Sequence, residues 1–499
     1  MVRRSAHFVF LTKSLDRSRR TSLESQLYAE IRDAIVAGRF RAGSRFPSTR
    51  VLASDLGISR NTVSNAFEQL TAEGFLCSRV GSGTYVAESL PDVFLRATEQ
   101  PGPSRAVAGR QGGCSRRIRK WQDFAKYFPV VPSVPFRHGL PALDEFPTKL
   151  WGQIAARRYR RLPADLLGYG APSGYEPLRR AIASYLAISR SVQADADQVI
   201  IVGGGSQQGL YLTTQLLLEK GDTAWIEDPG YLGARSTLLA VGARLVPVPV
   251  DEGGIRVEAG IRTRTRPRLI YVSPSNQYPL TVTMSLARRL ELLEFARRSG
   301  SWIIEDDYDS EFRYHSRPIA ALQGLRKDNR VIYVGTFSKL MIPGLRLGFV
   351  VAPPELVDGF TALNGLICRN PPALEQLILT DFIEEGHLAR HVRRMRVLYL
   401  ERQNYLCEIA ERELSGLLEL KAAPAGTHLV GFLPFGVRDV AWAKAASDAG
   451  VETLPLSKYY LGRVPRGGLI FGYAAYGRAA TRLGVQKLAA GLRHLTPAK

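Results

Sequence analysis

Cysteine is scarce in this sequence of 499 residues: it occurs only at Cys77, Cys114, Cys368 and Cys407, with no CxxC pair and no histidine at a metal-binding spacing. This pattern argues against a disulfide framework and predicts no metal site. Long apolar runs are also absent, since no segment approaches the ~18 residues that cross a membrane, and the stretch His7–Leu11 is too short for the core of a signal peptide. We therefore expect a cytoplasmic protein with no membrane partner.

An excess of proline or glycine, of the kind found in disordered chains, is missing as well. Hydrophobic residues make up 45% of the sequence and charged residues 23%, both close to the averages of globular proteins. At ~100–200 residues per domain, the length predicts two to four domains. Positive charge is in surplus: the formal net charge is +21, and the first 120 residues carry about half of it. This favours an anionic partner such as nucleic acid, with a generally basic proteome as the alternative.

Four zones divide the chain. Residues 1–20 are polar and basic without periodicity, and we expect a flexible basic arm there. Residues 21–88 are dense in helix start and stop signals, whereas residues 89–130 are rich in proline, glycine and basic residues, which predicts a linker. Residues 131–499 alternate short β-branched apolar runs with helical patterns, which is typical of a larger α/β domain.

The zone from residue 21 to 88 contains three predicted helices, each with a serine as candidate N-cap and a glycine where the helix stops. The serine and glycine pairs are Ser22 and Gly38, Ser48 and Gly57, and Ser59 and Gly74. Because only a short turn separates the second helix from the third, these two predict a helix-turn-helix. The segment Phe75–Val86 then has two short strand-like runs around a glycine-bearing turn, which predicts a β wing.

The third helix has a polar stripe opposite its apolar one, made of Arg60, Asn61, Ser64 and Asn65. These side chains can hydrogen-bond phosphates or base edges, and they stand near the helix N-terminus, where recognition helices touch DNA. A polar stripe on a single helix is more often only a solvated face. The order of helix, helix-turn-helix and wing, together with the basic flank, favours double-stranded DNA as a partner.

Three segments in this zone carry a resemblance to a known family: Gly43–Arg50, Ser59–Val63 and Glu73–Leu76. With them, residues 22–87 resemble the winged helix of GntR-type transcription factors. The resemblance implies a set of DNA-contacting positions. These are Arg50, Arg60, Asn61, Thr62, Ser64 and, in the wing, Gly81.

A lone lysine, Lys339, ends the segment Val331–Lys339, in which a predicted apolar strand leads into small hydroxyl residues. It stands among small hydroxyl residues rather than carboxylates, and a partly desolvated ammonium deprotonates readily, which would suit it to form a Schiff base. Taken alone, an ordinary surface lysine is the more common explanation. Arg346 follows seven residues later, and with Thr336 and Ser338 it could form a phosphate clamp of a guanidinium and two hydroxyl groups.

Carboxylates end a second predicted strand, in the segment Trp302–Asp309. A carboxylate beneath a pyridine nitrogen keeps that nitrogen protonated and sustains the electron-sink chemistry of pyridoxal 5'-phosphate (PLP), and a tyrosine two positions on can face the ring's phenolic oxygen. Asp306 and Tyr308 have this spacing. The alternative is a metal site formed by Asp306, Asp307 and Asp309, but no histidine or further carboxylate cluster supports it.

A glycine turn between a predicted strand and a predicted helix, Gly203–Ser206, offers backbone N–H groups and a hydroxyl to an anion. A dinucleotide fold is the competing interpretation. Its GxGxxG spacing fails at Gln208, and the Gly-Lys-Ser/Thr of a P-loop is absent. Tyr231, at the tip of a predicted loop, can stack on a flat cofactor, with a packing role as the equal alternative.

In this order, the four segments resemble the fold type I PLP enzymes of the aspartate aminotransferase superfamily over nearly all of residues 131–499. With the winged helix and the linker, the whole chain resembles the MocR family of bacterial regulators. The implied fold class is a winged helix-turn-helix (α+β) joined to an α/β fold type I PLP-dependent transferase-like domain, and the implied assembly is a homodimer.

The same resemblance implies a role for individual residues in binding PLP. They are Lys339 as the lysine that attaches the cofactor; Asp306 at the pyridine nitrogen; Tyr308 and Asn276 at the phenolic oxygen; Ser206, Gln207, Thr336, Ser338 and Arg346 around the phosphate; Tyr231 stacked on the ring; and Tyr169, which reaches the phosphate from a neighbouring subunit.

Two departures from the family pattern bear on activity. Relatives usually place an arginine in a C-terminal strand to grip a substrate carboxylate, and here Ile470 stands at that position. An apolar side chain cannot make this contact, and Arg463 or Arg466 in the preceding loop are the candidates to replace it. The Pro-Thr-Gly that commonly follows the asparagine segment is Pro279-Leu280-Thr281 here.

We therefore expect a transcription regulator that senses PLP or an amine through its aminotransferase-like domain, with at most slow half-transamination. The expected effector partner is a small-molecule amine or amino acid. An active aminotransferase that carries a DNA-binding module is the main alternative. A PLP-dependent domain without any DNA function is the third, and the polar stripe of the third helix disfavours it.

Overall fold

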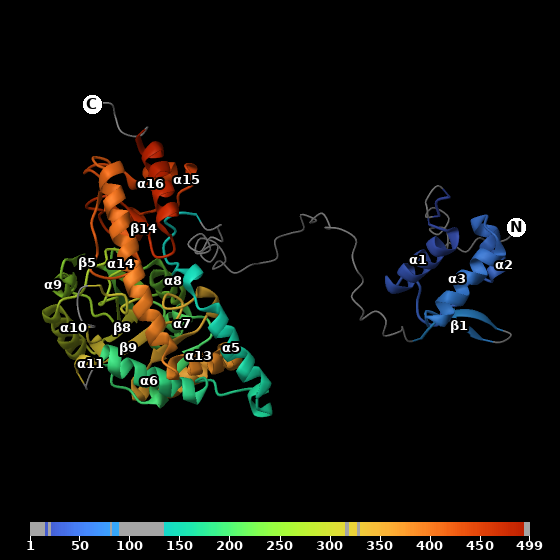
Figure 1. The fold of residues 1–499 in the computed structure, drawn as a ribbon. Coiled ribbons are helices and arrows are strands. Elements are labelled where there is room, and N and C mark those ends of the chain that lie inside the picture. The colour runs from blue at the N-terminus through green and yellow to red at the C-terminus, as the bar shows by residue number, and fades with distance from the viewer. Residues whose placement is uncertain are drawn as a thin grey trace. The chain divides into compact units, whose positions relative to one another are not determined.

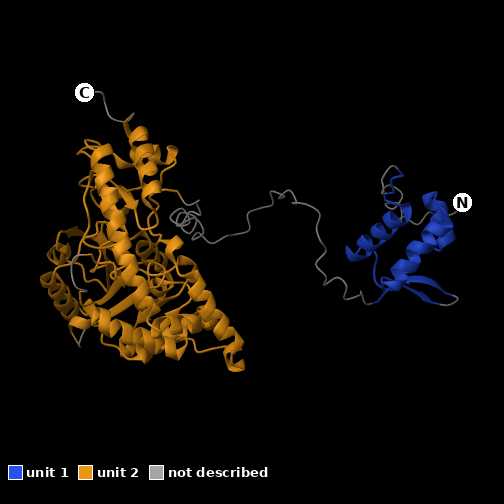
Figure 2. Cartoon of the chain, viewed as in Figure 1, with its two compact units in different colours: residues 1–113 blue, residues 114–499 orange. Residues whose placement is uncertain are grey.

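The structure is a computed structural model, and it describes residues 15–17, 21–79, 82–88, 134–314, 319–326 and 330–493. The chain divides into two compact units, residues 1–113 and 114–499 (Figure 2). Most of the expected basic arm and the whole of the expected linker, 89–130, lie outside the described residues, so the domain boundaries there stay predictions. No helix in the described ranges is long and apolar enough to span a lipid bilayer.

The first unit is a winged helix-turn-helix, as the sequence predicts (Figure 1). Its elements are α1 (Leu23–Val36), α2 (Thr49–Leu56), α3 (Arg60–Ala72), β1 (Leu76–Arg79) and β2 (Gly83–Val86). Each helix begins where a serine side chain accepts a hydrogen bond from a backbone N–H group of the first turn. The three caps pair Ser22 with Ser25, Ser48 with Val51 and Ser59 with Thr62, which confirms the three predicted N-caps.

These helices enclose one small apolar core. The inner face of α3 contributes Val63, which is fully buried, and Phe67, whose ring packs edge-on against Phe46 with the centroids 5.7 Å apart. Strands β1 and β2 pair antiparallel and form the predicted wing. Because α3 buries only this inner stripe, its opposite face is left to solvent.

The described part of the expected arm, residues 15–17, is anchored on this unit. Asp16 and Gln26 exchange two hydrogen bonds, at 2.9 and 3.0 Å. Arg17 Nη2 donates to the carbonyl oxygen of Gly57, in the turn between α2 and α3, at 2.8 Å. Backbone and side-chain groups of these three residues thus have partners on α1 and on the turn, while the flexibility expected of the arm stays a prediction.

The second unit is built on a mixed sheet of eight strands in the order β3-β10-β9-β8-β7-β4-β5-β6. The strands are β3 (Val199–Val202), β4 (Thr223–Asp228), β5 (Arg244–Asp251), β6 (Gly254–Ile255), β7 (Leu269–Val272), β8 (Trp302–Asp307), β9 (Val331–Thr336) and β10 (Gly348–Val351). Strands β9, β8, β7, β4 and β5 are parallel, whereas β3 and β9 both run antiparallel to β10. Carboxyl ends of parallel strands share one edge of a sheet, so the loops after β8 and β9 lie together there.

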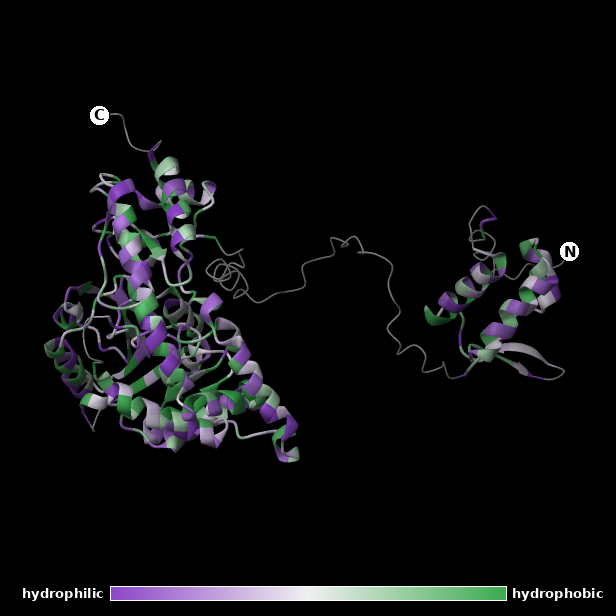
Figure 3. Cartoon of the chain, in the orientation of Figure 1, coloured by the Kyte–Doolittle hydropathy of each residue, from purple (hydrophilic) through white to green (hydrophobic). Residues whose placement is uncertain are grey.

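Helices cover both faces of this sheet (Figure 1). They are α5 (Thr148–Arg160), α6 (Glu176–Arg190), α7 (Ser206–Leu217), α8 (Leu232–Val241), α9 (Val257–Arg262), α10 (Leu286–Ser299), α11 (Leu322–Leu325), α12 (Val357–Cys368), α13 (Ala373–Glu384) and α14 (His387–Glu413). Neighbouring residues of β3 belong to two apolar cores, Ile200 to one and Ile201 to the other, as the alternation of side chains along a strand requires. Figure 3 shows the matching stripes of hydrophilic and hydrophobic residues on the helices.

A smaller antiparallel sheet near the C-terminus has the order β11-β12-β14-β13. It comprises β11 (Glu419–Leu420), β12 (His428–Phe432), β13 (Leu454–Pro455) and β14 (Gly468–Gly472), with α15 (Asp439–Asp448) and α16 (Arg478–Arg493) beside it. Ile470 of β14 pairs with Val430 on one side and with Leu454 on the other. The α/β fold expected for the second unit is confirmed.

Candidate functional site

The face of α3 opposite the core brings together most of the residues predicted to contact DNA. Arg60 and Asn61 are exposed, Thr62 and Ser64 are half-buried beside them, and Arg50 is exposed on α2. Gly81 lies outside the described residues, so its predicted contact is untested. The start of α3 thus presents a guanidinium, an amide and two hydroxyl groups, which are groups that hydrogen-bond phosphates and base edges.

Two members of the polar surface of α3 also serve the fold of the domain. The backbone N–H of Thr62 donates to Ser59 Oγ at 3.1 Å, and the two hydroxyl oxygens lie 2.9 Å apart. Asn65 Nδ2 donates to Glu24 Oε2 at 3.1 Å and so ties α3 to α1. The polar stripe predicted from the sequence therefore combines exposed side chains, whose contact with DNA stays a prediction, with a packing contact to α1.

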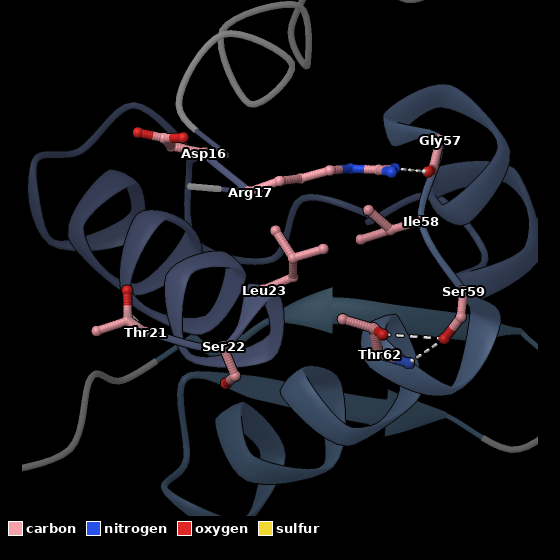
Figure 4. A pocket seen from close by; sticks show the side chains of 9 residues that line it. All are labelled: Asp16, Arg17, Thr21, Ser22, Leu23, Gly57, Ile58, Ser59 and Thr62. Atoms are coloured by element: carbon pink, nitrogen blue, oxygen red, sulfur yellow. Dashed lines mark hydrogen bonds between the residues drawn. The ribbon is translucent and has the colours of Figure 1, made fainter. Parts of the chain in front are cut away.

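A hollow beside the start of α3 is lined in part by residues that the sequence does not single out (Figure 4). The first turns of α1 and α3 border it at Ser22 and Ser59, and the N–H groups of a first turn carry partial positive charge. Arg17 reaches across the same hollow to Gly57. The hollow thus has a guanidinium next to the start of α3 and the carboxylate of Asp16 in the same lining, and only the fold shows that the two helix starts and Arg17 converge.

Two further arginines flank the wing. A Cβ atom on Gly83 of β2 would lie 3.1 Å from Arg45 Nε, so the exposed guanidinium of Arg45 covers that strand. Arg79 of β1 lies over the ring of Tyr85, 5.0 Å from its centroid, and 3.3 Å from a carboxylate oxygen of Glu88. Arg45 thus places positive charge on the wing, whereas the charge of Arg79 is paired with that of Glu88.

In the second unit, Lys339 stands just beyond the end of β9, at the edge of the sheet where β8 also ends. Its Nζ donates to the carbonyl oxygen of Gly139 at 2.5 Å. Burial lowers the pKa of Lys339, and the carboxylates of Asp309 and Asp306 oppose that lowering. The amine therefore deprotonates more readily than that of a surface lysine, which is what attack on a carbonyl carbon requires.

Asp306, near the end of β8, offers an unsatisfied oxygen. Tyr271 OH donates to its Oδ2 at 2.6 Å, whereas Oδ1 is buried without a hydrogen-bond partner among the described residues. Burial raises the pKa of Asp306 to about 7, while Tyr271 and Lys339 act in the opposite sense. A buried acceptor left unpaired costs stability, and the protonated ring nitrogen of PLP is a donor that would satisfy it.

The predicted phosphate clamp converges at the start of α7. Gly205, with φ of 71°, leads into Ser206, the first residue of the helix. A Cβ atom on Gly205 would lie 3.8 Å from Arg346 Nη1 and 3.9 Å from Ser338 Oγ, so these groups border one space. Thr336 Oγ1 accepts the backbone N–H of Ser338 at 3.1 Å. A guanidinium, hydroxyl groups and a helix N-terminus together match the charge of a phosphate.

Gln207 and Tyr231 are in contact, and this defines what each can do. Gln207 Nε2 donates to the carbonyl oxygen of Gly233 at 3.1 Å, and its Oε1 accepts from Tyr231 OH at 3.3 Å. The side chain of Gln207 thus holds the start of α8, and its part at the phosphate clamp falls to its backbone N–H group. The Tyr231 ring meets the ring of Tyr278 edge-on, with the centroids 5.7 Å apart.

Tyr308 and Asn276 meet each other next to Asp309. Tyr308 OH donates to the backbone oxygen of Asn276 at 2.8 Å, and Asn276 Nδ2 donates to both carboxylate oxygens of Asp309, at 2.8 and 3.0 Å. Asp307 instead forms an ion pair with Arg190 at 2.8 Å. Because the carboxylates face different partners, they form no metal site, and the described residues hold no cluster of metal-binding side chains. Asp309, considered from the sequence only as a metal ligand, is the residue that orients Asn276.

Tyr169 lies apart, on the surface of the chain. Its ring is 77% exposed, and the Arg369 guanidinium lies over it, 4.0 Å from the centroid. Leu167 and Leu366, each within a few residues of this pair, are exposed as well. An exposed aromatic and apolar surface suits contact with a second subunit, and the contribution of Tyr169 across a dimer stays a prediction.

Ile470 is fully buried in an apolar cluster beside these residues. The other members of the cluster are Tyr278, Val430, Leu456 and Tyr459. Tyr231 and Tyr308, two predicted cofactor residues, pack against the cluster. Ile470 therefore belongs to a wall next to the predicted cofactor position.

The two arginines considered as substitutes for the missing arginine differ in their surroundings. Arg466 Nε donates to the carbonyl oxygen of Leu433 at 2.6 Å, and its Nη1 lies 3.1 Å from Glu419 Oε2. Arg463 is exposed in the loop before β14. Arg466 is thus engaged with Leu433 and Glu419, and a replacement for the missing contact by either arginine stays a prediction.

Two parts of the chain match known protein families. Residues 23–86 match the family described as Bacterial regulatory proteins, gntR family. Residues 149–456 match the family described as Aminotransferase class I and II.

Curated relatives match the chain over both units. It is 41% identical to the Probable rhizopine catabolism regulatory protein MocR of Rhizobium meliloti, over 95% of this chain and 94% of the relative. It is 32% identical to the HTH-type transcriptional regulator TauR of Rhodobacter capsulatus, over 95% of this chain and 97% of that protein. Among solved structures, LysN, the α-aminoadipate aminotransferase of Thermus thermophilus complexed with N-(5'-phosphopyridoxyl)-L-leucine, is 28% identical and matches with a TM-score of 0.68, over 75% of this chain and 95% of that one.

Proposed function

Because the chain belongs to the MocR family of transcriptional regulators, we propose that it binds DNA as a homodimer and senses PLP or an amine through its aminotransferase-like domain. The observation that carries the sensing part is the unpartnered, buried Oδ1 of Asp306, whose carboxyl group lies within electrostatic reach of Lys339. A regulator of this build acts in the cytoplasm, where the chromosome is.

Each part of PLP has a candidate holder in the second unit. Lys339 would attach the aldehyde carbon, Asp306 Oδ1 would accept the ring N–H, and Arg346 with Ser338 would bind the phosphate. When bound, PLP supplies an electrophilic carbon and an electron-withdrawing ring that a primary amine can engage. Asp306 keeps the ring nitrogen protonated, and Tyr231 supplies an aromatic face for stacking.

DNA binding would fall to the first unit. Arg60, Asn61 and Ser64 supply donors for phosphates and base edges, and one winged helix reads only a half-site of a few base pairs. A dimer is therefore needed for tight, specific binding. The exposure of Arg346 at the phosphate clamp and of Tyr169 on the surface supports such a dimer, because a second subunit would cover both.

An active aminotransferase is the second candidate function. Lys339, Asp306 and the phosphate clamp favour this function, because together they provide the groups that cofactor attachment needs. Ile470 disfavours this function. Transamination depends on holding the substrate in one orientation, and a contact between the substrate carboxylate and an arginine usually does this.

The proposed function is tested with the full chain loaded with PLP, in footprinting on the DNA upstream of its own gene. We expect two protected half-sites, a dimer in sedimentation, and a DNA affinity or footprint that changes when PLP is removed. Lys339→Ala should still bind DNA but lose the response to PLP. Absence of protection at moderate salt, or an unchanged response in the variant, would overturn the proposal.

A further inference from the structure

One wall of the proposed cofactor site is aromatic and apolar, with Tyr278 at its centre. The ring centroid of Tyr278 lies 5.7 Å from that of Tyr231 and 6.1 Å from that of Tyr308, the two tyrosines proposed to meet PLP. The ring centroid of Tyr459 lies 5.4 Å from that of Tyr278. Ile470, which is fully buried, belongs to the same cluster. The position expected for a carboxylate-binding arginine is thus filled by an alkyl group inside an apolar wall.

Three described arginines around this wall have other partners. The contacts are Arg137 with Glu452 at 3.9 Å, Arg313 with Thr283 at 3.1 Å, and Arg466 with Glu419 at 3.1 Å. Each of these guanidinium groups thus has a partner with which a ligand carboxylate would compete. The bidentate contact that fixes a carboxylate is therefore not built into this wall.

Two histidines beside the wall are held neutral. The ring centroids of His428 and His138 lie 5.0 and 6.2 Å from that of Tyr278. Burial, together with the nearby charge of Lys339, lowers the pKa of His138 to about 3 and that of His428 to about 4. At neutral pH these rings offer hydrogen bonds to uncharged groups and no positive charge to an anion.

The groups that act on the Lys339 nitrogen, by contrast, are two carboxyl groups. Asp306 and Asp309 are both buried, and both influence that nitrogen. A ligand carboxylate would add a negative charge to this poorly solvated region, beside a wall whose described members are uncharged, which is unfavourable. Alkyl, aryl and hydroxyl groups would instead meet Ile470, the tyrosine rings and neutral imidazoles.

We propose that the ligand sensed at this site is a primary amine whose remaining groups carry no negative charge. The inference rests on the proposed function, because it takes Lys339 and Asp306 as the cofactor site. It narrows the effector class to amines that lack a carboxylate, sulfonate or phosphate.

The test uses pairs of compounds that differ only by an α-carboxylate. Calorimetric titration of the PLP-loaded full chain compares 2-phenylethylamine with L-phenylalanine, 3-methylbutylamine with L-leucine, and 2-aminoethanol with L-serine. We expect amines of this panel to bind at least about tenfold more tightly than their amino acids. An amino acid that binds as tightly as its amine overturns the inference, and so does a panel in which no amine binds at millimolar concentration.

A substitution in the wall gives the complementary test. Ile470→Arg should reverse the preference within a pair toward the amino acid, whereas Ile470→Met, which keeps the wall apolar, should retain the preference for the amine. If a folded, PLP-loaded Ile470→Arg chain shows no gain in affinity for amino acids, the inference is contradicted. If that variant does not fold, the matched pairs on the unmodified chain still decide.

Failure of this inference is distinguishable from failure of the proposed function. A chain that takes up no PLP, or that protects no DNA, fails the proposed function before any amine is added. A chain that binds PLP and DNA but prefers amino acids to the matched amines overturns only the effector class.

Discussion

Asp309 receives both of its carboxylate hydrogen bonds from one atom, Nδ2 of Asn276, at 2.8 and 3.0 Å. Asp309 is fully buried, and its charge is the largest influence that opposes the lowered pKa of Lys339. The contact thus couples two features of the proposed site: it fixes the carboxamide that would face the phenolic oxygen of PLP, and it sets part of the charge balance around the lysine.

Replacing Asp309 with asparagine is expected to lower the pKa of the Lys339 nitrogen, because the carboxylate raises it. Burial raises the pKa of Asp309 itself to about 8, so its negative charge is fully present only above that pH. The PLP-loaded variant, titrated by visible absorption from roughly pH 6 to 10, should therefore lose its protonated form at lower pH than the unmodified chain.

Asp381→Asn is the matched control for that titration. Asp381 lies on α13 and pairs with Arg157 at 2.8 Å, away from the residues that act on Lys339. We expect the pH midpoint of the visible-absorption titration of Asp381→Asn to equal that of the unmodified chain. A midpoint in Asp309→Asn that is unchanged or higher would show that Asp309 does not influence the lysine.

Lys339→Ala is expected to abolish covalent attachment of PLP. The unmodified chain purified with PLP should be yellow, and borohydride reduction should fix the cofactor to the chain as a mass increase. The variant should show neither, whereas Lys458→Ala, which removes an exposed lysine, should behave as the unmodified chain does. Attachment that persists in Lys339→Ala would assign the cofactor to another lysine.

The winged helix could be predicted almost completely because its determinants are local. Ser22, Ser48 and Ser59 each cap a helix within three residues of themselves, and an apolar stripe at helical spacing marks each buried face. The common location of Lys339 and Asp306 could be predicted for a related reason: each follows a short apolar run that predicts a buried strand, and parallel strands end at one edge of a sheet.

What could not be predicted depends on contacts between distant parts of the chain. Nothing near Asp309 in the sequence shows that it holds Asn276, and nothing near Gln207 shows that its side chain turns to Tyr231. The link from Lys339 to Gly139 spans 200 residues. Burial and charge at the site follow from this packing, so the pKa shifts become visible only in the folded chain.

Arg190 is expected to be important for stability because it neutralises a buried carboxylate on β8. Arg190 Nε lies 2.8 Å from Asp307 Oδ2, both side chains are almost fully buried, and Tyr333 OH donates to the same oxygen at 2.6 Å. Arg190→Met leaves Asp307 without its cationic partner and should lower the free energy of unfolding by ~3–5 kcal/mol, measured in urea. Adding Asp307→Asn should recover part of that loss, and an equal or larger loss in the double variant would show that the ion pair is not the cause.

Arg60 is expected to carry much of the specific DNA binding, because it is exposed at the start of α3, on the face that the domain core leaves to solvent. Arg60→Ala should weaken binding to the footprinted site by ~1–3 kcal/mol, measured by titration of labelled DNA with the full, PLP-loaded chain.

Arg32→Ala is the matched control, since Arg32 has the same charge and lies in the same domain but pairs with Asp33 on α1. Loss of a general electrostatic attraction would weaken both variants alike, and binding to unrelated DNA would fall with them. Loss confined to Arg60→Ala and to the specific site identifies α3 as the recognition helix, whereas equal effects of the two variants would place the DNA-reading surface elsewhere on the winged helix.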